Sequence, residues 1–162
     1  MVSVFLGIGS NIRADENLAM GLRELRSSFG DVAVSPVYRS APYGFEGDDF
    51  LNAVARIDTD LSPAEVHAEL ERIQTLAGRT RGPSRFLART LDIDLLLYAD
   101  LVLDEPPLRL PREDVLDYSF VLRPLADIAP ELIHPLTGRS MAAEWADFDE
   151  QCHPLQSTNI IL

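Results

Sequence analysis

The sequence predicts an α+β fold, in which an antiparallel sheet carries helices on one face and long loops form the active site. Three observations point to this class. Segments with the two-residue period of strands and the 3.6-residue period of helices alternate in the order β-α-β-β-α-β. The chain has 162 residues, enough for one domain with its own core. Hydrophobic residues make up 46% of it, as in ordinary globular proteins.

The first half of the chain predicts three strands and one helix. A strand is expected over 2–8, where β-forming residues precede a Gly-Ser-Asn turn signal. A helix is expected over 15–29, because leucines and a phenylalanine recur there every three or four residues. Residues 32–39 read as a strand in which Pro36 indicates an edge or a bulge. A loop rich in Gly, Pro and Asp then precedes a further strand over 50–58.

The second helix has a sharp start and a sharp stop. The stretch Ser62-Pro63-Ala64-Glu65 is a capping box with proline at the first helical position, and Gly78 ends the helix. Residues 79–88 have no clean period and contain a Gly-Pro pair, which predicts a loop. Residues 89–98 are apolar enough for a mostly buried strand.

Short helices are expected after Pro111, including one near 120–128, and the tail from about 149 is expected to be peripheral. We therefore expect residues 1–162 to form a single domain. The order of its elements is the ferredoxin-like βαββαβ arrangement, and the sheet face with the long loops is the expected place for a site.

The charge balance narrows the possible partners. The formal net charge of −12 argues against nucleic acid or an anionic membrane. No apolar run approaches the roughly 20 residues that span a bilayer. The single cysteine cannot form an internal disulfide, so a cytoplasmic location is expected. We expect a monomer, with a weak dimer as the alternative.

The arginines are unevenly placed. All 14 basic residues are arginine, and four of them, Arg79, Arg81, Arg85 and Arg89, fall within eleven residues. The planar guanidinium matches pairs of phosphate oxygens. A dense arginine cluster in an acidic chain therefore predicts a local anion site.

Two carboxylates follow this cluster directly. Asp92 and Asp94 alternate along an apolar strand, so their side chains share one face and their Cα atoms lie about 6.6 Å apart. Such a pair is often only the solvated face of a strand. Beside an arginine cluster, we favour a site for Mg²⁺, which is commonly held by one or two carboxylates together with substrate phosphates.

Several segments, in order and at matching spacing, resemble one family. They are LGIGSN, YRSAPYG with FLNAV after it, GRTRGPSRFLARTLDIDLLLY, and FVLRPLADIAPEL. They cover residue 4 to about 134 and resemble 6-hydroxymethyl-7,8-dihydropterin pyrophosphokinase of folate biosynthesis, for which the fold is the ferredoxin-like one. The resemblance implies that pyrophosphate passes from ATP to the pterin hydroxymethyl group, that AMP leaves, and that two Mg²⁺ ions bind.

The resemblance also implies roles for single residues. Asp92 and Asp94 would bind the metal and act in catalysis together with Arg79 and Arg89. Nucleotide contacts are implied for Glu71, Gln74, Arg81, Arg85, Leu95, Arg109 and Arg112. Pterin contacts are implied for Ser40, Pro42, Tyr43, Gly44, Phe50, Asn52, Phe86 and Phe120.

Four positions depart from the family pattern. Arg112 stands where histidine is usual, Tyr118 replaces an arginine, Phe86 a tryptophan and Gln74 a glutamate. These departures keep two alternatives open: a low-activity paralogue that binds pterin or nucleotide in a non-catalytic or regulatory role, and a kinase for a related pterin alcohol. A fixed cation at Arg112 would strengthen the binding of ground-state ATP without raising the chemical rate.

Overall fold

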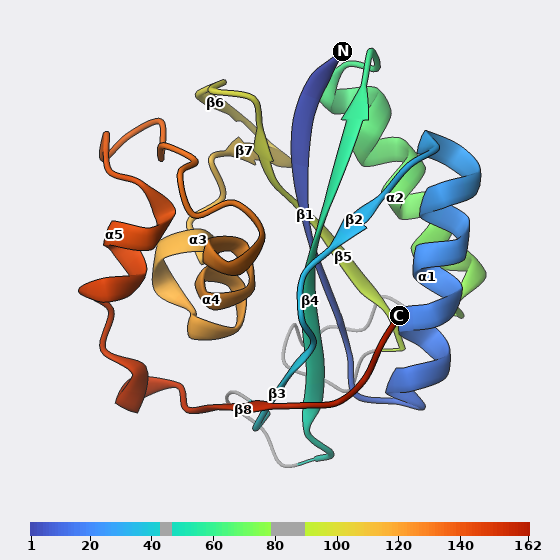
Figure 1. The fold of residues 1–162 in the computed structure, drawn as a ribbon. Coiled ribbons are helices and arrows are strands. Elements are labelled where there is room, and N and C mark those ends of the chain that lie inside the picture. Colours follow the sequence, from blue (N-terminus) through green and yellow to red (C-terminus); the bar gives the residue numbers. More distant parts are fainter. Residues whose placement is uncertain (43–46, 79–89) are drawn as a thin grey trace.

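Six of the described strands join into one antiparallel sheet in the computed structural model, which describes residues 1–42, 47–78 and 90–162. The sheet order is β5-β1-β4-β3-β8, and β2 pairs with β4 beside β3. The strands are β1 (Val2–Ser10), β2 (Ala33–Val34), β3 (Tyr38–Ser40), β4 (Phe50–Thr59), β5 (Asp92–Tyr98) and β8 (Leu155–Ser157). The long strands β1, β4 and β5 form the centre of Figure 1.

Helices α1 (Ala14–Phe29) and α2 (Pro63–Leu76) cover one face of the sheet (Figure 1). Their buried leucines pack against alternate residues of β1 and β4, such as Leu6 and Ala55. The capping box is confirmed: Ser62 Oγ accepts from Glu65 N at 3.2 Å, and Ser62 N donates to the Glu65 carboxylate at 3.1 Å. The expected ferredoxin-like βαββαβ core is confirmed.

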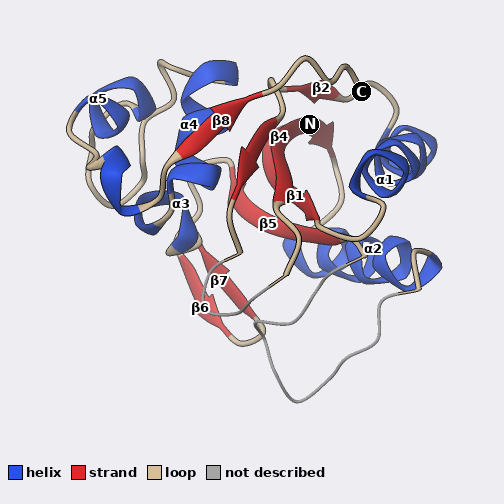
Figure 2. Ribbon diagram, turned by 90° about the horizontal axis from the view of Figure 1, so that it is seen from below, coloured by secondary structure: helices blue, strands red, loops and turns tan. Residues whose placement is uncertain are grey.

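The second face of the sheet is partly covered by helices that follow this core. They are α3 (Asp114–Asp117), α4 (Ser119–Ile128) and α5 (Met141–Ala146), which lie opposite α1 and α2 in Figure 2. They form a second core cluster with Phe5, Val54 and Leu97. The expectation of helices on one face holds for α1 and α2, and the later helices leave one end of the second face for the site. Among the described residues, every helix is too short or too polar to cross a bilayer.

Three segments differ from the sequence prediction. The strand expected over 32–39 is divided into β2 and β3, with Ser35 and Pro36 at the break, where Ser35 N still donates to Val54 O. A hairpin that the sequence analysis did not predict is formed by β6 (Leu103–Glu105) and β7 (Leu108–Leu110). The tail contributes the 3₁₀ turn η1 (Glu150–Cys152) and the edge strand β8.

A β-bulge explains how three consecutive leucines in β5 are all buried. Leu6 pairs with Leu95 while Phe5 pairs with Leu97, so Leu96 is the extra residue. Leu95 packs with the α1–α2 cluster, whereas Leu96 and Leu97 both join the cluster of α3–α5. Before the bulge, the alternation leaves Asp92 and Asp94 on the second face.

Candidate active site

A row of residues crosses the second face of the sheet beyond the cluster that α3–α5 form with Phe5, Val54 and Leu97. In the strand register Asp92 of β5 pairs with Gly9 of β1, and Gly9 pairs with Asn52 of β4. Residues paired across strands share a face, so the carboxylate and the amide lie on the same side with only a glycine between them. Two strand spacings separate their Cα atoms by about 10 Å.

Glycines form the floor between the two polar groups. Asp94 pairs with Gly7, so both aspartates have a glycine as cross-strand neighbour. A side chain at Gly9 would meet the Asn52 Oδ1 atom at 3.2 Å, which is tighter than an ordinary contact. The absence of a side chain at Gly9 therefore leaves room for the amide of Asn52.

Arg112 is the cation nearest to Asp94 in the described part of the chain. Its backbone N–H donates to Leu96 O at 2.9 Å, which fixes Arg112 beside β5. Its guanidinium lies 3.8 Å from the Asp94 carboxylate and 3.2 Å from that of Asp114. Burial alone would lower the pKa of Arg112, but the charges of Asp94, Asp114 and Asp92 outweigh it and raise that pKa. The carboxylates and Arg112 thus form one electrostatic group.

Gln74, for which the resemblance implied a nucleotide contact, is buried against β5. Its side chain is 2% exposed. The Oε1 atom accepts from the backbone N–H of Ile93 at 3.1 Å, and the Nε2 atom donates to Leu70 O at 3.0 Å. Glu71 lies one turn earlier on α2 and is half-buried.

Two other residues for which nucleotide contacts were implied, Leu95 and Arg109, have protein partners in the structure. Leu95 is buried in the core that α1 and α2 cover, on the opposite face from Asp94. The Arg109 guanidinium pairs with Asp104 at 3.3 Å and with Glu113 at 2.9 Å. The structure therefore gives Leu95 a packing role and places Arg109 in a surface ion-pair network.

The expected pterin contacts fall into two groups. Asn52 Nδ2 donates to Ser40 Oγ at 2.8 Å, and both residues are buried. Phe50 pairs with Ser40 in the register, and Pro42 follows β3. The second group is aromatic: the Phe120 and Tyr118 rings stack at a centroid distance of 4.9 Å.

Seven expected site residues lie outside the described residues. They are Tyr43, Gly44, Arg79, Arg81, Arg85, Phe86 and Arg89.

The structure also brings in residues that the sequence analysis did not select. Ser10 Oγ donates to Thr90 O, just before β5, and Asn11 Nδ2 donates to Asp48 O at 3.1 Å, just before β4. Asp114 joins the Arg112 group. The available signal for Ser10 and Asn11 was their place directly after the strand expected over 2–8; both side chains are buried in the structure, where such groups need partners.

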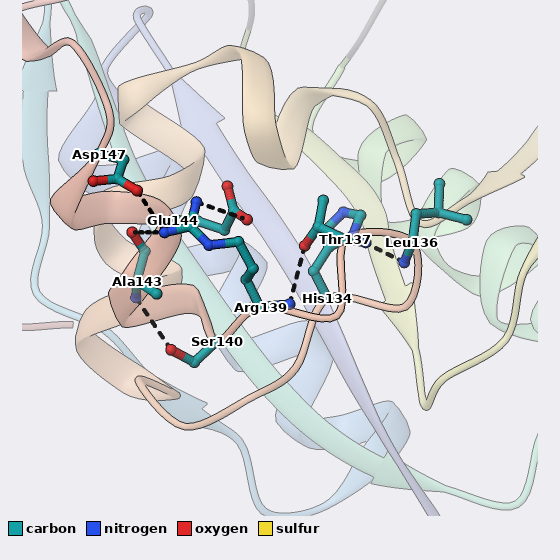
Figure 3. Close-up of polar contacts among 8 residues, drawn as sticks. All are labelled: His134, Leu136, Thr137, Arg139, Ser140, Ala143, Glu144 and Asp147. Atoms are coloured by element: carbon teal, nitrogen blue, oxygen red, sulfur yellow. Dashed lines mark hydrogen bonds and ion pairs between the residues drawn. The ribbon is translucent and has the colours of Figure 1, made fainter.

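His134, to which the sequence analysis gave no role, stabilises a turn. Its Nδ1 atom accepts from Leu136 N at 3.1 Å and from Thr137 N at 3.3 Å (Figure 3). Burial lowers the pKa of this imidazole, and the neighbouring Glu144 only partly offsets the effect. The imidazole therefore favours its neutral form, which suits an acceptor of two N–H groups.

The aspartate pair offers only oxygen ligands. Such ligands suit Mg²⁺ and not a soft metal. Within the described ranges, no group of three or more His, Cys, Asp or Glu side chains is arranged to hold a metal. Two carboxylates provide part of a coordination shell, so further oxygens must come from water or from phosphates.

A separate cavity of about 270 Å³ is lined by residues of β3, α4, α5 and the tail. The Arg123 guanidinium stands in its wall, 5.7 Å from the Tyr38 ring centroid and 5.3 Å from that of Trp145. Its lining includes His153 but none of the expected pterin contacts.

Comparison with known proteins gives concordant matches. Residues 5–130 match the family model of 7,8-dihydro-6-hydroxymethylpterin-pyrophosphokinase. The 2-amino-4-hydroxy-6-hydroxymethyldihydropteridine pyrophosphokinase of Haemophilus influenzae is 37% identical over 139 residues, which cover 83% of this chain and 86% of the relative. The Pseudomonas aeruginosa protein of the same name is 39% identical over 136 residues, with coverages of 82% and 83%.

Solved structures agree in fold. The Plasmodium falciparum HPPK-DHPS structure with pterin and p-hydroxybenzoate superimposes with a TM-score of 0.74 at 14% identity. The match covers 93% of this chain and 43% of the other, so this chain spans less than half of that bifunctional protein.

Proposed function

Because the chain belongs to the 7,8-dihydro-6-hydroxymethylpterin-pyrophosphokinase family, we propose that Asp92 and Asp94 are the residues that bind Mg²⁺ for its reaction. The reaction is the ATP-dependent transfer of a pyrophosphoryl group to 6-hydroxymethyl-7,8-dihydropterin, which releases AMP. The observation that carries the assignment is the row Asp92, Gly9 and Asn52 on one sheet face. This row supports the proposal, because the carboxylate of Asp92 and the amide of Asn52 lie on the same side of a glycine floor.

We propose that Asn52 and Ser40 bind the edge of the pterin, because both are buried, polar and hydrogen-bonded to each other. A pterin edge offers donors and acceptors to such groups. Phe120 provides a ring face for stacking, and its contact with Tyr118 holds that ring in place. The pterin would lie over the floor with its hydroxymethyl group toward Asp92.

The carboxylates act on the nucleotide side. Asp92 and Asp94 would hold the Mg²⁺, for which we propose two ions, and the metal would supply positive charge that neutralises the phosphates during in-line displacement. Asp92 and Asp94 hold fixed positions on a strand. The positive charge of the bound metal would therefore lie on the same sheet face as Asn52, at the other end of the row. The side chain of Arg112 is 38% exposed beside Asp94, within reach of a phosphate oxygen.

The low-activity paralogue is not favoured, because family and relatives agree over most of the chain. A kinase for a related pterin alcohol stays an alternative, since Asn52 and Ser40 read the ring edge and not the substituent. We further propose that the protein acts as a monomer in the cytoplasm, where its single cysteine stays reduced.

The direct test is AMP release from ATP with Mg²⁺, with and without 6-hydroxymethyl-7,8-dihydropterin, followed by mass analysis of the pterin product. We expect AMP to appear only when pterin and Mg²⁺ are both present, and the pterin to gain two phosphoryl groups. AMP release independent of the pterin, or transfer of a single phosphoryl group, would contradict the proposal.

A further inference from the structure

Strand β5 lies at the edge of the sheet, and its open side is closed by side chains and backbone from other elements. On the inner side β5 pairs with β1. On the outer side, the Ile93 N–H donates to Gln74 Oε1 at 3.1 Å, and Leu96 O accepts from Arg112 N at 2.9 Å. Unpaired edge groups are otherwise left to water or to another chain. Gln74 therefore supplies a hydrogen bond that a neighbouring strand would normally give.

The bonded residue stands between the two carboxylates. Ile93 points into the α1–α2 core, while Asp92 and Asp94 point to the opposite face. A shift of the Ile93 backbone would move both carboxylates together, because one peptide unit joins it to each of them. The hydrogen bond that Gln74 accepts from Ile93 thus acts on the positions of both carboxylates through the backbone of β5.

Gln74 is itself held firmly. Its side chain is 2% exposed, and Nε2 donates to Leu70 O, so the amide has a defined orientation with Oε1 toward β5. The helix that carries it is fixed by the capping box at Ser62 and by the buried Ile73. Position and orientation are both set before any substrate binds.

We infer that Gln74 is a positioning residue for the metal pair: its amide holds the Ile93 backbone and thereby sets the geometry in which Asp92 and Asp94 bind Mg²⁺. The inference rests on the proposed function, because it presupposes the metal site at the two aspartates. It also gives this buried amide a role other than nucleotide contact.

Three full-length variants separate positioning from plain stability. Gln74→Met has a similar length but neither donor nor acceptor. Gln74→Glu keeps an acceptor for the Ile93 N–H, but its carboxylate faces Leu70 O. Thr75→Ala is the matched control, because Thr75 Oγ1 makes the same type of bond, to Glu71 O at 2.9 Å, on the exposed side of α2.

The measurements are calorimetric titration with Mg²⁺ in the presence of a non-hydrolysable ATP analogue, thermal unfolding, and hydrogen exchange at the Ile93 amide. We expect Gln74→Met to raise the Kd for Mg²⁺ about tenfold, as for groups that support metal ligands from behind, and to speed Ile93 exchange. Gln74→Glu should lower Tm yet keep the Mg²⁺ affinity close to that of the parent protein. Thr75→Ala should leave both the affinity and the exchange rate unchanged.

Two results would overturn the inference. One is an unchanged Mg²⁺ affinity in Gln74→Met. The other is a loss of affinity that follows Tm through all variants, with Gln74→Glu affected as strongly as Gln74→Met. The variant Asp92→Asn, measured in parallel, distinguishes a failure of the positioning role from a failure of the metal assignment. If that variant loses Mg²⁺ binding while Gln74→Met keeps it, only the positioning role fails; if Asp92→Asn also keeps it, the metal assignment fails as well.

Discussion

In the proposed site, Arg112 would influence the binding of both the metal and the nucleotide. It forms ion pairs with Asp94 and Asp114, and the side chains of Arg112 and Asp94 are 38% and 37% exposed. Ion pairs this exposed contribute about 0.2–1 kcal/mol, far below the Coulomb energy of a buried pair. The pair is thus weak enough to separate when a metal ion takes Asp94 and a phosphate takes Arg112.

We therefore predict opposite effects of Arg112→Ala on the two ligands. Removal of the competing cation should lower the Kd for Mn²⁺, measured by electron paramagnetic resonance without nucleotide, by a factor of about 1.5 to 5. The KM for ATP should rise, because a charged hydrogen bond to phosphate is lost. Arg56→Ala is the control, since Arg56 makes a similarly exposed pair with Asp58 at 3.5 Å. Weaker Mn²⁺ binding in Arg112→Ala would show that Arg112 supports the metal site instead of competing with it.

His134 predicts a pH dependence of stability. Its pKa in the folded protein lies below the ordinary 6.5, because burial disfavours the imidazolium. Between the two values the unfolded chain binds more protons, so the stabilisation is complete above about pH 6.5 and is lost as the pH falls. The loss has a slope of at most about 1.4 kcal/mol per pH unit.

Urea unfolding between pH 7.5 and 5.5 should show this loss in the parent protein. It should be smaller in His134→Asn, whose amide oxygen can accept from Leu136 N and Thr137 N but does not titrate. Equal pH slopes in the two proteins would assign the dependence to other groups.

At the scale of elements, the tail supports the pterin half of the proposed site. Strand β8 pairs with β3, where Ser40 is opposite Leu155, and Ser119 Oγ donates to His153 O. The His153 ring meets Tyr118 edge-on at a centroid distance of 5.5 Å. The tail residues that make these contacts, His153 and Leu155, lie beyond the family match, which ends at residue 130.

We predict that a chain ending at residue 149 has a raised KM for the pterin, by roughly fivefold, with little change in the KM for ATP. The estimate corresponds to about 1 kcal/mol, the typical net worth of one lost hydrogen bond. A chain ending at residue 157 is the matched control, because it loses the same terminus but keeps β8 and His153. If both truncations change the two KM values alike, the effect is one of general stability.

At the scale of the whole molecule, we propose that residues 1–162 fold as one unit. The terminal Ile160 and Leu162 pack against the same core as Val4 of β1, and β8 belongs to the main sheet. The two helix layers bury the sheet on both faces and leave the aspartates, glycines and Asn52 at one end.

Local signals explain why the sequence predicted so much of this arrangement. The capping box places α2, and the alternation of Asp92 and Asp94 gives their common face, because both depend on neighbouring residues alone. Pro36, which indicated an edge or a bulge in one strand, lies at the break between β2 and β3. Strand β8 and the hairpin of β6 and β7 were missed, since three-residue strands are defined by their partners and not by a period.

The contact between Gln74 and β5 was not predicted, for a related reason. Gln74 stands four residues after the buried Leu70 on α2 and is itself buried. What periodicity cannot supply is the partner, the Ile93 N–H on an edge strand nineteen positions away. The strand order that makes β5 an edge follows from long-range pairing.

The most direct test of the central assignment is the single-turnover rate of pterin pyrophosphorylation in the parent protein, Asp92→Asn and Asp94→Asn at saturating ATP and Mg²⁺. Each variant keeps the size of the side chain but removes the charge that holds the metal. We expect the rate to fall by roughly a hundredfold or more in both, as when a group that stabilises transition-state charge is lost. Asp58→Asn, on the distant end of β4, should react at the parental rate. A near-parental rate in either site variant would contradict the assignment of Mg²⁺ to the Asp92–Asp94 pair.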